Sequence, residues 1–140
     1  MTILDTNVVS EVMRPAPDPG VLTWIRSLPR DEIWTSSVVV AELLSGIDFM
    51  PNGGKQQALR DAVEGMIAED FRGQILSFDL NAACYYGQIL ANSRRTGRPI
   101  AEMDAEIAAI AAVHGATLAT RNTCDFKHCG IALVNPWQPA

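Results

Sequence analysis

Two acidic residues follow apolar segments that have the pattern of buried strands. Asp5 comes directly after Ile3-Leu4, which predicts a short strand with a carboxylate at its C-terminal end. Asp125 follows a second apolar strand, predicted over 117–120, through the turn-like stretch Arg121-Asn-Thr-Cys. In open parallel α/β sheets, ligands bind outside the carboxyl ends of the strands. We therefore expect both carboxylates at the same edge of one sheet, where chemistry is usual.

Two further acids fall on the apolar side of predicted helices. A helix is expected over 38–50, and three- and four-residue spacing puts Glu42 on one face with Val38, Val39, Gly46 and Phe49. A second helix is expected over 102–114, where Asp104 shares its face with Ile107, Ala108 and Ala111. We expect both faces to point inward, where a charge is costly unless it is paired or metal-bound. Asp104 also lies in the first helical turn, where the helix dipole favours negative charge.

Acids gathered at one edge would need a counter-charge. Two like charges about 4 Å apart cost about 4 kcal/mol at an effective dielectric near 20. Some of the acids must then be protonated, or a cation must hold them together. Oxygen ligands without His or Cys favour Mg²⁺ or Mn²⁺ over zinc. A metal-activated water that attacks a phosphodiester is the natural chemistry of such a site.

Each acid also has an ordinary structural explanation. Asp5 suits the N-cap of a helix expected over 8–13, since Asp and Asn are favoured caps. Glu42 could form an ion pair on the surface of its helix. Asp104 could be a favourable charge in the first turn of its helix, like its neighbour Glu102, and Asp125 could simply form a turn. The catalytic interpretation depends on the convergence of the acids rather than on any one of them.

Strands alternate with helices along the chain. Strands are expected at 3–4, 33–36, 74–78, 117–120 and 131–134, and helices at 8–13, 19–28, 38–50, 56–69, 81–95 and 102–114. Asp18 caps the second helix with Pro19 at its first position, Ser36 or Ser37 starts the third, and Gly115 ends the last. This alternation predicts a three-layer α/β/α fold with a central, mostly parallel five-stranded sheet. No linker or repeat divides the 140 residues, so we expect one domain over 1–140.

Composition limits the functional classes. With 48% hydrophobic and 19% charged residues, the chain should fold as a globular protein. No run can cross a bilayer and no basic segment precedes the first apolar run, so a cytoplasmic protein with reduced cysteines is expected. The net charge of −5 argues against a general nucleic-acid coat but not against a nuclease with local basic groups. The basic clusters are Arg94, Arg95 and Arg98, and then Arg121 and Lys127, and they suit either binding or plain surface charge.

Several segments in order resemble the PIN-domain nucleases, and within them the VapC-type toxins of prokaryotic toxin–antitoxin pairs. The matching segments are Leu4-Asp-Thr-Asn7, Ser37-Val-Val-Val-Ala-Glu-Leu43 with Gly46, Arg98-Pro-Ile with Asp104, Thr120-Arg-Asn-Thr-Cys-Asp-Phe126, and the ending Val134-Asn-Pro-Trp137. Each segment is a weak signal alone, but their order and spacing fit along nearly the whole chain.

This resemblance implies a metal-dependent endoribonuclease with an acidic pocket. Its acidic positions would be Asp5, Glu42, Asp104 and Asp125, with Asp5 and Asp104 as the direct ligands of Mg²⁺, for which Mn²⁺ could substitute. Glu42 and Asp125 would hold a second ion or orient the attacking water, and Thr6 and Asn122 would be polar supports. Ser36 or Ser37 would be a further polar support of the site. Glu102 departs from the family pattern, which leaves its membership of the site open.

The resemblance also implies partners. These are an RNA substrate, a small cognate VapB-type antitoxin that plugs the acidic pocket with a basic side chain, and a second copy in a homodimer and larger toxin–antitoxin assembly. Operator DNA would be bound only through the antitoxin. The apolar side chains Trp24, Ile25 and Leu28, and the helix over 38–50, are interface candidates, although apolar helical stripes are usually core.

Other classes remain as alternatives. A non-catalytic RNA- or protein-binding module on the same fold is the main one, because fold does not determine function. A phosphoaspartyl phosphatase or receiver domain also starts with a strand and an Asp, but such phosphatases have a second acid where this chain has Asn7. A zinc site at Cys124, His128 and Cys129 lacks a fourth ligand at a useful spacing.

Overall fold

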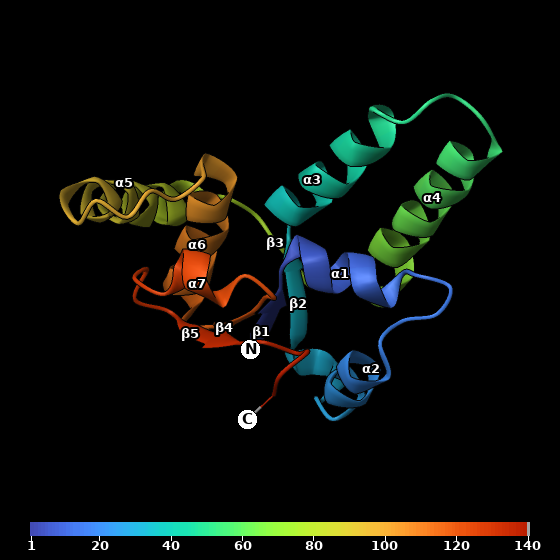
Figure 1. Cartoon of the computed structure of the whole chain (residues 1–140), viewed down its shortest axis with the longest axis horizontal. Helices are drawn as coiled ribbons and strands as arrows, with labels where there is room; N and C mark the ends of the chain where they lie inside the picture. Colours follow the sequence, from blue (N-terminus) through green and yellow to red (C-terminus); the bar gives the residue numbers. More distant parts are fainter. Residues whose placement is uncertain (140) are drawn as a thin grey trace.

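A parallel sheet of five strands forms the centre of the structure, a computed structural model that describes residues 1–139 (Figure 1). The strands are β1 (Thr2–Leu4), β2 (Ile33–Ser36), β3 (Ile75–Leu76), β4 (Thr117–Ala119) and β5 (Ala132–Val134). Their order is β3-β2-β1-β4-β5, and every neighbouring pair is parallel. The predicted fold class is confirmed, and β1 is the central strand. Asp5 therefore follows the middle strand at the carboxyl edge of the sheet.

Helices cover both faces of this sheet. They are α1 (Thr6–Val12), α2 (Pro19–Arg26), α3 (Ser37–Asp48), α4 (Gly54–Gly65), α5 (Leu80–Arg95), α6 (Glu102–His114) and α7 (Thr123–Phe126), with short turns η1 (Arg30–Glu32) and η2 (Met66–Asp70). In Figure 1, α5 and α6 lie on one side of β1 and β2, and α1, α2 and α4 lie on the other. No helix within residues 1–139 is long and apolar enough to cross a membrane.

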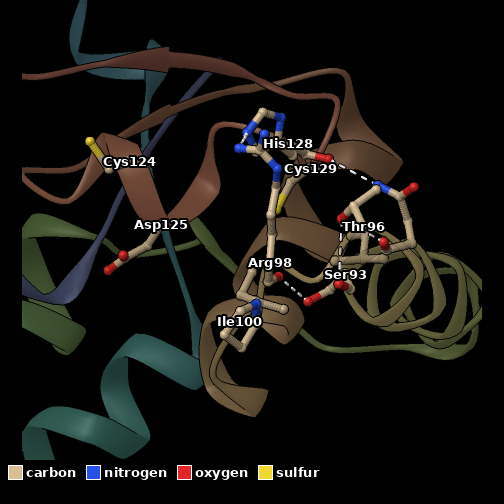
Figure 2. A pocket seen from close by; sticks show the side chains of 11 residues that line it. Ser93, Thr96, Arg98, Ile100, Cys124, Asp125, His128 and Cys129 are labelled. Atoms are coloured by element: carbon tan, nitrogen blue, oxygen red, sulfur yellow. Dashed lines mark hydrogen bonds between the residues drawn. The ribbon is translucent and has the colours of Figure 1, made fainter.

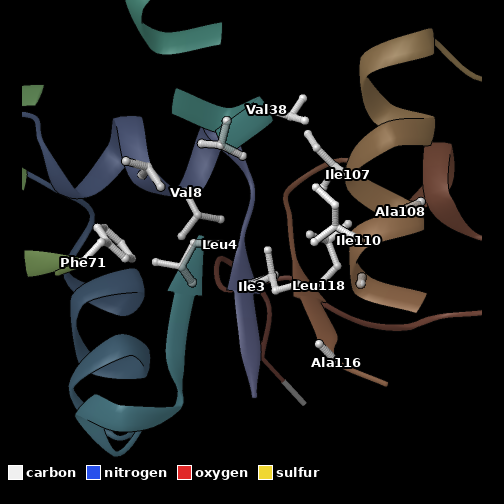
Figure 3. Packing of buried hydrophobic residues seen from close by; sticks show 14 of the residues in the cluster. Ile3, Leu4, Val8, Val38, Phe71, Ile107, Ala108, Ile110, Ala116 and Leu118 are labelled. Carbon is white, nitrogen blue, oxygen red and sulfur yellow. The ribbon is translucent and has the colours of Figure 1, made fainter. Parts of the chain in front are cut away.

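The side chains of β1 alternate between the two faces. Ile3 points toward α6, beside Leu118 and Ile110, while Leu4 points to the other face, near Val8 (Figure 3). All five of these side chains are at most 1% exposed. Burying a branched aliphatic side chain stabilises a fold by about 1.5–3 kcal/mol, so this two-sided core holds β1, β4, α1 and α6 in fixed positions.

Local sequence signals set several helix ends as expected. The Asp18 side chain caps α2 and Pro19 is the first residue of that helix. Ser36, rather than its neighbour, caps α3 by accepting a hydrogen bond from the Val39 N–H at 3.2 Å. Gly115 ends α6 with a φ of 57°, a left-handed conformation that costs glycine little because it has no Cβ.

Two elements differ from expectation in length. The helix predicted over 56–69 runs over α4 and then widens into a π turn at η2, where the Phe71 N–H donates to the Met66 carbonyl at 3.0 Å. In this wider turn the side chains of Met66 and Phe71, five positions apart, are both buried in the core, with 5% of each exposed. The strand predicted over 74–78 is only the two residues of β3, which lies at the edge of the sheet and pairs with β2 alone. The short helix α7 was not expected.

The inward face predicted around Glu42 is partly wrong. Val38 and Val39 are buried as expected, but Gly46 is exposed and Phe49 is 89% exposed. The reason is that α3 extends away from the strands toward its C-terminal end, as Figure 1 shows, so its last turn has no sheet to pack on. By contrast, the inward face predicted around Asp104 is confirmed, because its neighbours Ile107, Ala108 and Ala111 are fully buried. Of the apolar interface candidates, Trp24 and Ile25 are partly buried against the core.

Candidate acidic site

The four predicted acids converge at the carboxyl edge of the sheet. Asp104, in the first turn of α6, is the clearest sign of this, because its pKa is raised to about 6. Burial is the largest cause, and the charges of Asp5, Glu42 and Asp125 follow. The Asp104 carboxylate therefore lies close enough to Asp5, Glu42 and Asp125 to be affected by their negative charges. We call the negative potential of these four acids the shared field. The convergence expected from the sequence is therefore present.

Asp5 is the most buried of these acids, with 4% of its surface exposed. Its Oδ1 accepts a hydrogen bond from the Thr6 N–H at 2.8 Å, and its Oδ2 accepts one from the Thr120 hydroxyl at 2.7 Å. Both hydrogen bonds lower the pKa of Asp5, but burial outweighs them and Asp125 adds to it, so the net pKa is raised. The bond to Thr6 also makes Asp5 the N-cap of α1, so the structural explanation and the site coexist.

Glu42 brings a second half-buried carboxylate to the site. Its pKa is raised, first by burial and then by Asp5 and Glu106, while the nearby Thr6 hydroxyl acts in the opposite direction. Even so, Glu42 Oε1 and Thr6 Oγ1 make no hydrogen bond of normal geometry, and both atoms are buried. An unpaired buried polar atom costs about 1–3 kcal/mol. These two oxygens are therefore suited to a polar ligand or a cation that the protein itself does not supply.

Thr120 and Asn7 support the site, although sequence patterns did not single them out for this role. The Thr120 hydroxyl, which donates to Asp5, accepts from the Asn122 N–H at 3.1 Å. The Asn7 side chain donates to Thr120 Oγ1 at 3.4 Å and accepts from the Arg121 N–H at 3.1 Å. Together they tie the loop after β4 to the start of α1. Asn122, predicted as a support, acts here through its backbone.

The remaining polar candidates divide between the site and its surroundings. Ser36 is fully buried and its hydroxyl is engaged in capping α3, whereas Ser37 is partly exposed. Glu102 is exposed and is not among the charges that raise the pKa of the other acids. Glu106, one turn further along α6, does raise the pKa of Glu42 and was not predicted. The four-residue spacing between Glu102 and Glu106 was the only sequence feature that could have indicated that Glu106 lies near the site.

The acids fit a hydrated cation better than a closed metal cage. Within residues 1–139, no three His, Cys, Asp or Glu side chains are arranged to bind a metal ion as they stand. Mg²⁺ usually binds through one or two carboxylates and keeps several waters, so it does not require such a cage. The oxygen-only donors, the raised pKa of Asp104 and the unpaired Glu42 Oε1 fit this mode.

Replacing Thr120 with valine should raise the pKa of Asp5 further and destabilise the fold. Valine has nearly the same shape but cannot donate to Asp5 or accept from the Asn122 N–H, and each buried group left unpaired costs about 1–3 kcal/mol. In the pH–rate profile, the fall in cleavage activity at acidic pH should move to higher pH. Urea unfolding and a pH–rate profile measure both effects. Thr120→Ser keeps the hydroxyl and is the control; equal profiles for the two variants would contradict the role given to this hydrogen bond.

Comparisons with known proteins identify the family and agree with this fold. The sequence profile of the PIN domain family matches residues 2–130. The chain is 38% identical to the VapC ribonuclease Y4jK of Sinorhizobium fredii over all of both chains. It is 41% identical to the toxin FitB of Neisseria gonorrhoeae, over 98% of this chain and 99% of that one. A solved structure of FitAB bound to a DNA fragment, IR36, matches with a TM-score of 0.91 and 39% identity, over 100% of this chain and 98% of that chain. The chain belongs to the PIN-domain family, among its VapC- and FitB-type members.

Proposed function

We propose that this protein is the toxin of a type II toxin–antitoxin pair and acts as an Mg²⁺-dependent endoribonuclease. The observation that carries the proposal is the shared field of Asp5, Glu42, Asp104 and Asp125 at the carboxyl end of the central strand. A relative that is 38% identical over the full length is named a VapC ribonuclease, and another is named a toxin. Asp5, Glu42 and Asp104 are held at a cost in burial, which is better explained by catalysis than by a plain binding module.

In this mechanism, Asp5 and Asp104 would hold the cation, and Mn²⁺ could substitute for Mg²⁺. A bound cation of this kind lowers the pKa of water and neutralises charge that develops on the phosphate. Thr120 and the Thr6 N–H keep Asp5 in one orientation. The raised pKa of Glu42 favours proton uptake, so Glu42 Oε1 would accept the proton of the attacking water. Asp125 is exposed on α7 and would orient that water or hold a second ion.

We also propose that a cognate VapB-type antitoxin neutralises this activity, as the FitAB complex suggests. An acidic pocket in a chain of net charge −5 attracts a basic side chain. A cavity of about 370 Å³ adjoins the site between α1, α3 and α4, with Thr6 and Glu42 in its wall and otherwise mainly apolar lining. The antitoxin, rather than this chain, would contact operator DNA, and the toxin would form a homodimer within a larger assembly.

Incubation of the purified protein with total cellular RNA tests the proposed activity. With Mg²⁺ or Mn²⁺, we expect discrete fragments whose mapped ends identify the target, and we expect EDTA to abolish them. Asp5→Asn should lose the cleavage, whereas Glu102→Gln, which removes a nearby exposed charge, should keep it. Cleavage that persists in EDTA, or that is equal in wild type and Asp5→Asn, would contradict the proposal.

A further inference from the structure

Two basic segments that lie far apart in the sequence meet beside the acidic site. The end of α5 and the loop after it carry Arg94, Arg95 and Arg98, and the turn after α7 carries Lys127 and His128. The Asn92 side chain donates to the His128 carbonyl at 3.4 Å, and the Arg98 guanidinium donates to His128 Nε2 (Figure 2). The structure thus joins basic groups that the sequence separates by about 30 positions.

Within the described part of the chain, none of these basic residues forms an ion pair with a carboxylate. The ion pairs within residues 1–139 are Met1–Glu32, Arg14–Glu11 and Arg60–Asp48, and none of them includes a residue of this basic region. The backbone that presents Arg98 is nevertheless well anchored: its N–H donates to the Ser93 carbonyl at 3.0 Å, and the Ser93 hydroxyl donates to the Arg98 carbonyl. The backbone at Arg98 is therefore held in place, and its guanidinium, which has no carboxylate counter-charge within residues 1–139, is available to an anion.

A small cavity of about 130 Å³ lies between the two segments. Its polar wall consists of Asn92, Ser93, Thr96, Arg98 and His128, and its apolar wall includes Ile89 and Ile100. Asp125 also borders this cavity, yet Figure 2 shows its carboxylate pointing away from Arg98 and His128. One side of α7 thus faces the basic cavity, while Asp125 raises the pKa of Asp5 and Asp104 in the acidic site.

We propose that this cavity binds a backbone phosphate of the RNA substrate, next to the phosphate that is cleaved. An RNA strand is repelled by a chain of net charge −5, so it needs local positive groups to lie across the acidic site. A guanidinium has five N–H donors, and the bond to His128 uses one of them. The others suit paired hydrogen bonds to phosphate oxygens. This inference rests on the proposed ribonuclease function.

Arg98→Gln is expected to weaken substrate binding rather than the chemical step. Loss of a charge-assisted contact should raise KM about 10-fold with kcat nearly unchanged, because the contact is made equally before and during cleavage. For a single strand, the slope of log affinity against log salt should fall by about 0.7 for one lost phosphate contact. The probe is a single-stranded RNA that contains the mapped cleavage site. Binding is measured in EDTA and kinetics are measured in Mg²⁺.

Two further variants serve as controls. Arg98→Lys keeps the charge and should restore most of the salt slope. Arg72→Gln removes the same charge from an exposed residue in the turn before β3, at the opposite end of the strands, and should leave KM and slope unchanged. Circular dichroism establishes that each variant is folded.

The outcomes separate this proposal from the proposed function. If wild type cleaves and only Arg98→Gln shows the higher KM and smaller slope, the phosphate site is supported. If wild type cleaves but Arg98→Gln behaves like Arg72→Gln, or loses kcat alone, the phosphate site is overturned while the ribonuclease stands. If wild type neither cleaves nor binds RNA, the proposed function fails and this inference fails with it.

Discussion

Asp5→Asn is expected to reduce RNA cleavage by at least about 100-fold without unfolding the protein. Asparagine has the same shape, can still accept from the Thr6 N–H and can donate to Thr120 Oγ1, so the local hydrogen bonds survive in large part. It removes a nearly buried negative charge whose pKa is raised by burial. The metal-free variant should therefore be at least as stable as wild type at neutral pH, although it is inactive.

Two measurements check this separation of activity from stability. Initial cleavage rates of the mapped RNA give the loss of activity, and urea unfolding gives the free energy of unfolding. Glu102→Gln is the matched control, because Glu102 is acidic and exposed and lies outside the shared field. Loss of both activity and folding in Asp5→Asn would contradict this separation of the two roles. An active Asp5→Asn would exclude it as a metal ligand.

Asp104→Asn is expected to lose cleavage to a similar extent and also to change how stability depends on pH. Its pKa in the folded protein is raised to about 6, above its value in the unfolded chain. The unfolded state therefore releases this proton at lower pH than the folded state does. The contribution of Asp104 to stability is fully present below about pH 4 and is lost as pH rises through about 6.

The variant should thus match wild type at acidic pH and exceed it at pH 8, where wild-type Asp104 is ionised. One pKa unit corresponds to about 1.4 kcal/mol, but partial exposure and a lost helix-dipole contact reduce the gain to about 1 kcal/mol. Urea unfolding at both pH values measures it. Glu102→Gln, in the same first turn, loses only the dipole contact and should be slightly less stable at pH 8. If both variants lose stability there, the repulsion assigned to Asp104 is absent.

The sequence predicted those parts of the fold and site that depend on local signals. Helix α6 has the predicted bounds because Gly115 supplies a left-handed stop, and its apolar spacing correctly placed Asp104 on a buried face. Asp5 was placed at the sheet edge because a buried strand precedes it. The last turn of α3 was misplaced, since the exposure of Phe49 depends on where the sheet ends rather than on helical spacing.

The sequence predicts that the acids meet at one sheet edge, but it does not predict the individual side-chain contacts between distant segments. Thr120 supports Asp5 because β4 lies beside β1, and the two residues are 115 positions apart. Glu106 acts on Glu42 because two helices approach each other, and Arg98 meets His128 because α5 ends near α7. The sequence shows which segments contain polar residues. Which of these residues contact one another depends on how the sheet and helices pack.

Calorimetric titration of Mn²⁺ and Mg²⁺ into the metal-free protein tests most directly whether the four acids form one cation site. Protons compete with the cation for Asp104, so wild type should bind clearly at pH 8 and more weakly at pH 5. Asp5→Asn and Asp104→Asn should lose this binding, and Glu102→Gln should retain it. Equal binding by all four proteins, or none by wild type at pH 8, would contradict the assignment of this acidic site as the metal-dependent centre.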